Sequence, residues 1–190
     1  MSKQKFLVLI DCQNDFITGA LGSKEADAVV PVIVEEVKKA IKNNVRILLT
    51  YDSHYEDSYP NSLEGKKLPI PHCIVNTEGR DIDSRISELL GDAKYTNYDT
   101  YYKTTFGSDS LYRDFSLYKA MGLSPSGVGD VEITLMGFCT DICVISNALA
   151  LRMAMPNATI QVKSDCCAGT SKEAHEAALI VMKSCQIDIM

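Results

Sequence analysis

Two largely apolar stretches, residues 6–10 and 45–51, most constrain how this chain can fold. Residues 6–10 are continuously apolar, without alternation, which is typical of a strand buried on both faces of a parallel sheet, and residues 45–51 predict a second buried strand. Between them, residues 26–42 carry apolar side chains at helical spacing. A strand, helix, strand order of this kind makes a right-handed parallel crossover. The sequence therefore predicts an α/β fold.

Length and composition favour one domain and exclude several classes of partner. The 190 residues are 46% hydrophobic, enough for one well-buried core, so we expect a single domain over residues 1–190. The net charge is −6 and no run of Lys or Arg exceeds a pair, which argues against a nucleic-acid or membrane surface. No apolar stretch reaches the length of a membrane span, and the seven cysteines lack zinc-finger spacing, so we expect a cytoplasmic protein with reduced thiols.

Residues 133–151 predict a strand that runs into a helix through a tight turn. The apolar run ends at Gly137, a polar turn follows, and Cys143 opens a helical pattern. There the thiol would lie beside unpaired N–H groups and the positive end of the helix dipole, both of which favour thiolate over thiol. The same N–H groups could hold the oxyanion that forms when sulfur attacks a carbonyl. Alternatively, Cys143 is a small buried hydrophobic residue.

Asp11 and Lys103 occupy comparable positions elsewhere in the chain. Asp11 follows the strand at residues 6–10, where α/β sheets bind ligands, although an Asp that caps a turn is an equal alternative. A further strand is expected over residues 93–98, with Lys103 in the loop after it. Most lysines are solvated, but a Lys beside a carboxylate and a thiol would lower the pKa of the thiol.

The long connection at residues 53–77 suggests a metal site. Asp52 and His54, two residues apart, project to the same side of an extended segment and could bind one ion. His72 and Glu64 could complete the site, although Glu56 or Asp57 could replace Glu64. Metal ligands at both ends would order a connection of this length, which has little periodicity. The alternative is a surface loop with solvated carboxylates and imidazoles.

Five motifs, in one order along nearly the whole chain, resemble those of a known family. They are LVLIDCQNDF, TYDSH, PHC, YKTTFGS and GFCTDICV. This set resembles the isochorismatase-like cysteine hydrolases, and within them it is most similar to the nicotinamidases, also called pyrazinamidases. The resemblance implies a doubly wound α/β domain with a six-stranded parallel sheet flanked by helices.

The resemblance also implies roles for individual residues. It carries a catalytic triad onto Asp11, Lys103 and Cys143, and an oxyanion site onto the backbone N–H groups of Cys139 and Cys143, after a cis Phe138–Cys139 peptide. It implies metal ligation by Asp52, His54 and His72, with Glu64 fitting a variant of the family pattern. Phe16 would stack on the substrate ring. Because residues 68–71 are aliphatic or proline where related enzymes often carry an aromatic residue, Tyr102 or Phe106 could pack against the ring instead.

The activity implied is hydrolysis of nicotinamide, and of pyrazinamide, to the acid and ammonia through a cysteine thioester, in NAD salvage. One divalent ion is implied as cofactor, with zinc first and iron or manganese as alternatives. The partner expected is this small-molecule substrate, while self-association into a homo-oligomer stays open. Two other functions also stay open: a metal-free cysteine amidohydrolase acting on carbamoyl or ureido substrates, and a non-catalytic α/β module that binds ligands or partner subunits.

Overall fold

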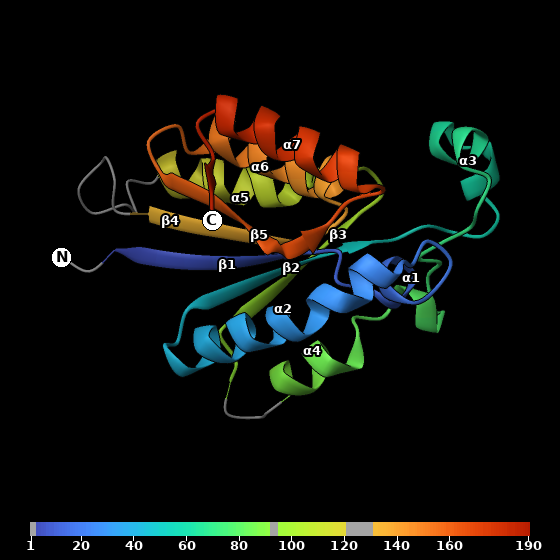
Figure 1. The fold of residues 1–190 in the computed structure, drawn as a ribbon, viewed down its shortest axis with the longest axis horizontal. Coiled ribbons are helices and arrows are strands. Elements are labelled where there is room, and N and C mark those ends of the chain that lie inside the picture. Colours follow the sequence, from blue (N-terminus) through green and yellow to red (C-terminus); the bar gives the residue numbers. More distant parts are fainter. Residues whose placement is uncertain (1–2, 92–94, 121–130) are drawn as a thin grey trace.

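A computed structural model describes residues 3–91, 95–120 and 131–190 of the chain. In these residues six parallel strands form one sheet in the order β3-β2-β1-β4-β5-β6 (Figure 1). The strands are β1 (Gln4–Ile10), β2 (Arg46–Asp52), β3 (Tyr98–Lys103), β4 (Val131–Phe138), β5 (Thr159–Ala168) and β6 (Asp188–Ile189). The prediction of an α/β fold with a doubly wound, six-stranded parallel sheet is confirmed.

Helices cover both faces of the sheet. In Figure 1, α2 (Lys24–Lys42) and α4 (Ser84–Leu90) lie on one face, and α5 (Asp109–Ala120), α6 (Ile145–Ala154) and α7 (Lys172–Ser184) lie on the other. Helix α2 begins where Ser23 accepts a hydrogen bond from the N–H of Ala26 at 3.0 Å. Its apolar stripe faces the sheet, with Val30, Ile33 and Val37 fully buried.

The strand order reverses between β1 and β4, which locates the functional edge of the sheet. The chain runs outward through β2 and β3, then returns to place β4 on the other side of β1. The loops that follow β1 and β4 therefore diverge and leave a crevice at the carboxyl ends of these strands. At this edge Gly137 pairs with Ile10 and has a φ of +124°. A Cβ at residue 137 would lie 2.0 Å from the carbonyl oxygen of Ile10, so glycine is required there.

The connection at residues 53–77 contains short helices that its sequence did not predict. They are the 3-10 helix η1 (Tyr59–Asn61) and α3 (Leu63–Lys67), which stands out from the body of the molecule (Figure 1). Ser62 caps α3 by accepting a hydrogen bond from Gly65 N–H at 2.9 Å. Two further short helices, α1 (Asn14–Ile17) and η2 (Glu78–Arg80), contact each other beside this connection.

The strand expected over residues 93–98 is wrong in its position. Residues 93 and 94 lie outside the described part of the chain, residues 95–97 are not in a strand, and β3 begins at Tyr98. Tyr95 is buried and donates a hydrogen bond to the carbonyl of Asn97 at 3.0 Å, a contact that local patterning does not reveal. Lys103 is consequently the last residue of β3 and not part of the following loop. Among the described residues, no helix is long and apolar enough to cross a membrane.

Candidate active site

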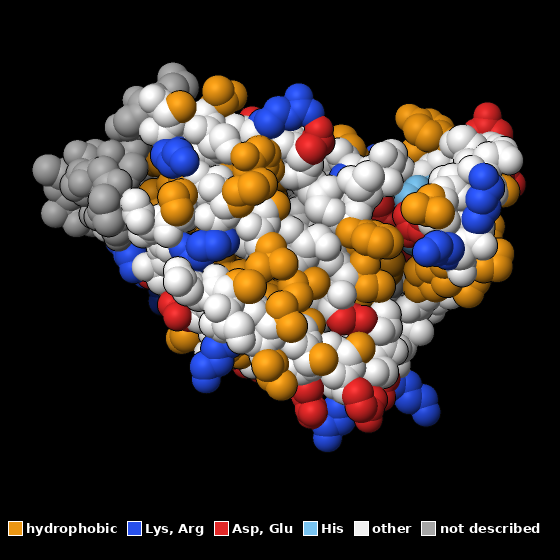
Figure 2. Space-filling model, turned by 90° about the horizontal axis from the view of Figure 1, so that it is seen from above, with side chains coloured by type: hydrophobic (Ala, Val, Ile, Leu, Met, Phe, Trp, Pro, Cys, Tyr) orange, Lys and Arg blue, Asp and Glu red, His pale blue; other side chains and the backbone are white. Residues whose placement is uncertain are grey.

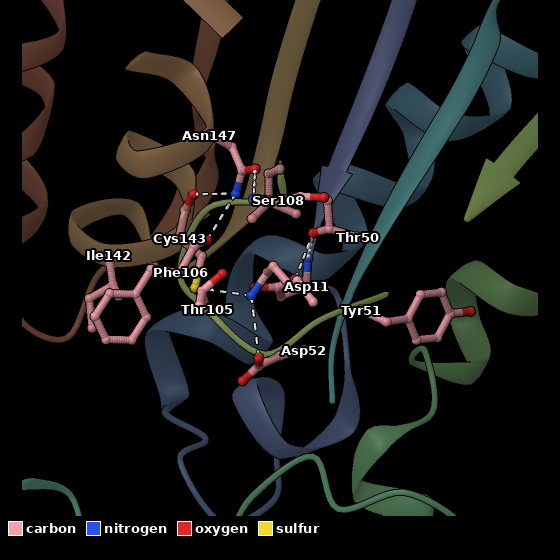
Figure 3. Close-up of polar contacts among 12 residues, drawn as sticks. Asp11, Thr50, Tyr51, Asp52, Thr105, Phe106, Ser108, Ile142, Cys143 and Asn147 are labelled. Atoms are coloured by element: carbon pink, nitrogen blue, oxygen red, sulfur yellow. Dashed lines mark hydrogen bonds and ion pairs between the residues drawn. The ribbon is translucent and has the colours of Figure 1, made fainter. Parts of the chain in front are cut away.

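Three side chains from separate segments of the chain meet at the carboxyl edge of the sheet. Asp11 follows β1, Lys103 ends β3, and Cys143 lies in the π-helical turn η3 (Thr140–Val144) between β4 and α6. The ammonium nitrogen of Lys103 lies 2.7 Å from Asp11 Oδ2 and 3.6 Å from Cys143 Sγ. All three side chains are buried, and Figure 3 shows Asp11 and Cys143 at this edge of the sheet. The structure thus brings together the three residues expected to form a triad.

Thr50 holds the carboxylate of Asp11 in place. Its hydroxyl donates to Asp11 Oδ1 at 2.5 Å and accepts from the Asp11 N–H at 3.1 Å. Asp11 has a φ of +47°, a left-handed conformation that Asp tolerates better than most residues. The N–H of Gln13 donates to the Asp11 carbonyl at 2.7 Å and also supports this conformation. Thr50 was missed by the sequence argument, although a polar residue in the otherwise apolar core of β2 was a usable signal.

Burial has the largest effect on the pKa values of Asp11, Cys143 and Lys103. It raises the pKa of Asp11 against the opposing charge of Lys103. Burial and the charge of Asp11 together raise the pKa of Cys143 well above its ordinary value, and Lys103 only partly offsets them. Burial opposes the charged form of Lys103, but Asp11, Cys143 and Asp52 together raise its pKa, so it stays protonated. These shifts oppose the thiolate that the position at the helix start was expected to favour, so a base is needed to take the thiol proton.

A second cluster, formed by Asp52, His54, Glu64 and His72, adjoins the triad. One donor atom from each residue lies within 4.8 Å of the others. Asp52 Oδ2 lies 2.9 Å from His54 Nε2 and 3.4 Å from His72 Nε2. The Glu64 carboxylate lies 3.8 Å from His54 Nε2 and 3.5 Å from His72 Nε2. Of the three acidic residues considered in this connection, the structure brings Glu64 to the cluster, while Glu56 and Asp57 are exposed.

The chemistry of this cluster fits a divalent cation. His72 Nδ1 lies 2.9 Å from the Ile70 carbonyl, to which it can only donate, so neutral His72 presents a lone pair at Nε2. That lone pair faces the oxygens of Asp52 and Glu64, and either a cation between them or a proton on His72 Nε2 would offset the repulsion. The two carboxylates raise the pKa of His72 to about 10 although burial opposes the shift. Mixed carboxylate and imidazole donors suit zinc, iron or manganese.

Asp52 links the cation cluster to the triad. Its Oδ1 lies 3.4 Å from Lys103 Nζ, while its Oδ2 faces the two histidines. The buried side chain of Gln13 holds the backbone of Asp52: Oε1 accepts from Asp52 N–H at 2.8 Å and Nε2 donates to the Asp52 carbonyl at 2.9 Å. Gln13 was also missed, although an amide in the DCQNDF motif, directly after a buried strand, was a usable signal.

A cavity of about 1050 Å³ opens over both groups. It is lined by Cys143, Cys139, His54 and His72, and by Phe16 and Phe106, two of the three aromatic residues expected to contact substrate. Figure 2 shows the molecule hollowed between its body and the lobe that carries α3, with histidine and acidic side chains in the hollow. The Phe16 ring meets the His72 ring edge to face at 5.6 Å between centroids.

Tyr102, the third aromatic residue expected to contact substrate, is not among the residues that line the cavity. Its ring is exposed and lies under the Arg80 guanidinium, 4.8 Å from the ring centroid. Alternation along β3 explains this, because Tyr102 and the inward-facing Lys103 point to opposite faces. Tyr59 lines the cavity instead, with its ring centroid 4.8 Å from that of His54 and its hydroxyl donating to the Leu68 carbonyl at 2.8 Å.

The Phe138–Cys139 peptide is cis, as the resemblance implied. Cys139 and Cys143, the two residues whose N–H groups were expected to bind an oxyanion, both line the cavity. The carbonyl of Cys139 accepts hydrogen bonds from Ile142 N–H at 3.1 Å and from Val144 N–H at 3.0 Å, which ties the turn together. Each expected site residue except Tyr102 therefore contributes to the cavity or to the triad beneath it.

Comparison with known proteins agrees with this fold. Residues 5–190 match the isochorismatase domain, so the chain belongs to the isochorismatase family. A Bacillus subtilis protein described as an uncharacterized isochorismatase family protein, PncA, is 33% identical over 150 residues, which cover 77% of each chain. The chain is similar to the crystal structure of nicotinamidase PncA from Bacillus subtilis, with 28% sequence identity, a TM-score of 0.78 and 98% of each chain covered. It is also similar to the crystal structure of pyrazinamidase/nicotinamidase from Streptococcus mutans, with 27% identity, a TM-score of 0.79, and 98% of this chain and 99% of that one covered. The predicted resemblance is confirmed.

Proposed function

We propose that this protein is a nicotinamidase, which hydrolyses nicotinamide, and pyrazinamide, to the corresponding acid and ammonia. The observation that carries the proposal is the contact of Lys103 with both Asp11 and Cys143 on the floor of a cavity whose wall holds a cation cluster. The solved structures described as nicotinamidase and pyrazinamidase support the choice of substrate class.

The first half of the reaction forms a thioester. Asp11 takes the proton of the Cys143 thiol as the sulfur attacks the carboxamide carbon. Because burial and the charge of Asp11 raise the pKa of the Cys143 thiol, removal of its proton would accompany the attack of the sulfur. Lys103 stays charged between the two groups and stabilises the anionic character that passes from Asp11 to sulfur. The N–H groups of Cys139 and Cys143 would hold the oxyanion.

The second half regenerates the enzyme. Asp11 gives its proton to the departing amine, the C–N bond breaks, and ammonia leaves with the nicotinoyl group bound to sulfur. Asp11 then takes a proton from a water molecule as that water attacks the thioester carbon. The C–S bond breaks, Asp11 returns this proton to the Cys143 sulfur, and nicotinic acid leaves and ionises to nicotinate. Thr50 keeps the Asp11 carboxylate oriented through both proton transfers.

The cation cluster would hold one divalent ion through Asp52, His54, Glu64 and His72. When bound, the ion supplies a Lewis-acid site for a ring nitrogen, which orients the substrate. Phe16 and Phe106 would contact the ring from the cavity wall. Asp52 contributes to both groups, since it faces Lys103 and the histidines at once.

The test is release of ammonia and nicotinate from nicotinamide by the metal-loaded protein and by Cys143→Ala. We expect release by the parent protein and a loss of at least about 10³-fold in the variant. Cys185→Ala, which removes a thiol at the far end of α7, controls for non-specific thiol effects and should keep the parent rate. If the parent released no ammonia the substrate would be wrong, and carbamoyl or ureido substrates would be assayed next. Undiminished release by Cys143→Ala would contradict the role of the thiol.

A further inference from the structure

Asn147 makes a set of buried hydrogen bonds that the proposed reaction does not use. It lies on the first turn of α6, four residues after Cys143, and is 1% exposed. Its Nδ2 donates to the Cys143 carbonyl at 2.8 Å and to the Phe106 carbonyl at 3.1 Å, and its Oδ1 accepts from the Ser108 N–H at 2.9 Å (Figure 3). One side chain therefore bonds to two separate segments of the site.

The two segments carry different parts of the cavity. The π-helical turn Thr140–Val144 bears the nucleophile, and the connection between β3 and α5 bears Phe106 on the cavity wall. The connection starts directly after Lys103 and reaches Ser108, whose hydroxyl accepts from Leu111 N–H at the start of α5. Between these ends, residues 104–106 line the cavity, and Asn147 bonds the main chain on both sides of Gly107.

The side-chain amide of Asn147 has the donors and the acceptor needed to join the two segments. Both donor hydrogens and one acceptor lone pair are in use, and all three partners are main-chain groups, whose positions follow the backbone directly. The neighbouring Ser146 donates to the Ile142 carbonyl at 2.6 Å, in the π-helical turn that directly precedes α6. Among the residues of this first turn, Asn147 is thus the one whose side chain reaches across to the wall.

We propose that Asn147 is a positioning residue that sets the distance of the Phe106 wall from Cys143 and thereby the affinity for the ring of the substrate. This rests on the proposed function, because it assigns a specificity role within the same cavity. Asn147 would not touch the substrate; it acts through the backbone of residues 106–108. A small displacement of such a wall is enough to lower affinity, since binding depends on close packing against the ring.

The variant Asn147→Thr separates the hydrogen bond to Cys143 from the two hydrogen bonds to residues 106 and 108. In a helix a Thr hydroxyl can bond the carbonyl four residues back, so it can keep the Cys143 contact, but it is too short to reach residues 106–108. We expect the KM for nicotinamide to rise about tenfold while kcat changes less than about threefold. Amide hydrogen exchange at residues 104–108 should rise about tenfold, with no change in β1. Asn147→Asp serves as a second variant if Asn147→Thr does not fold, since its oxygen would repel the Phe106 carbonyl.

Two controls distinguish positioning from a general loss of stability. Ser108→Ala removes the cap of α5 but leaves the Ser108 N–H bonded to Asn147, so KM should stay within about twofold of the parent value. In Phe106→Ala the ring is gone, so adding Asn147→Thr should raise KM no further. If the rise in KM of the double variant equalled the product of the rises in the two single variants, the proposal would be overturned.

The outcomes also separate this inference from the proposed function. The inference would be overturned, and the proposed function kept, if the parent protein hydrolysed nicotinamide and the folded Asn147→Thr variant showed unchanged KM and unchanged amide hydrogen exchange. A parent protein without activity would remove the function. In that case unchanged exchange at residues 104–108 in Asn147→Thr would still contradict the positioning role.

Discussion

The hydroxyl of Thr50 lies 2.5 Å from Asp11 Oδ1 and also accepts the backbone N–H of Asp11. The other carboxylate oxygen, Oδ2, lies 2.7 Å from the ammonium of Lys103. Each oxygen of a fully buried carboxylate thus has its own polar partner, and both partners favour the ionised form against the cost of desolvation. The two contacts offset part of the effect of burial, which still leaves the pKa of Asp11 above its ordinary value.

Thr50→Val tests this arrangement through the pH profile. Asp11 accepts a proton only when ionised, so kcat/KM falls as the pH is lowered through its pKa, and burial moves that pKa above its ordinary value of 3.8. Removing the Thr50 hydrogen bond raises the pKa further. We expect the acidic limb of kcat/KM to move to higher pH by about 0.5–1 unit. An unmoved limb would mean that Asp11 is not the group that titrates.

Glu64→Gln tests the fourth position of the cation cluster. Replacing the carboxylate by a neutral amide removes one charge that faces His54 and His72, so the Kd for zinc should rise about 10- to 100-fold in a chelator competition. Glu56→Gln is the matched control, because Glu56 is exposed in the same connection. Equal Kd values for zinc in the two variants would show that Glu64 is not a ligand.

Replacing Phe106 and replacing Tyr102 should have different effects on the affinity for substrate. Phe106 lines the cavity, so Phe106→Ala should raise the KM for nicotinamide about tenfold, the loss expected for one apolar ring contact. Tyr102 packs under Arg80 away from the cavity, so Tyr102→Ala should leave KM within about twofold. Steady-state kinetics decides both, and a larger effect at Tyr102 than at Phe106 would contradict the placement of these side chains.

Gly137→Ala tests the close approach of β1 and β4 beneath the site. The new Cβ would meet the Ile10 carbonyl at 2.0 Å in a left-handed conformation, so the free energy of unfolding should fall by about 3 kcal/mol or more. Gly91→Ala is the control. Residue 91 has a φ of −75° and its Cβ would lie 3.4 Å from the Ser87 carbonyl, an ordinary contact, so unfolding in denaturant should change by less than about 1 kcal/mol.

Local patterns predicted the buried centre of the fold well. The apolar runs of β1 and β2 and the stripe of α2 report burial directly, because these elements pack on the core. Strand β3 was displaced in the prediction because it lies at the edge of the sheet, where alternate residues are exposed and Tyr95 is buried by tertiary contacts. Edge strands carry a weaker hydrophobic signal than central ones.

The sequence predicted the site residues whose own side-chain type indicates chemistry. It missed the residues whose role depends on where the fold places them. Asp11, Lys103 and Cys143 were selected by motif and by their reactive groups, but the resting state of the thiol depends on burial, which the sequence does not express. Gln13, Thr50 and Asn147 are neutral residues that act through hydrogen bonds to distant segments. Their partners lie about 39–41 positions away along the chain, so local spacing could not identify them.

The central claim is that the substrate is bound covalently to Cys143 during the reaction. Its most direct test is hydrolysis of nicotinamide in the presence of hydroxylamine, which competes with water for a thioester. We predict that nicotinohydroxamate forms in proportion to hydroxylamine at the expense of nicotinate, while Cys143→Ala gives neither product. An active protein that yields only nicotinate at every hydroxylamine concentration would contradict the thioester mechanism.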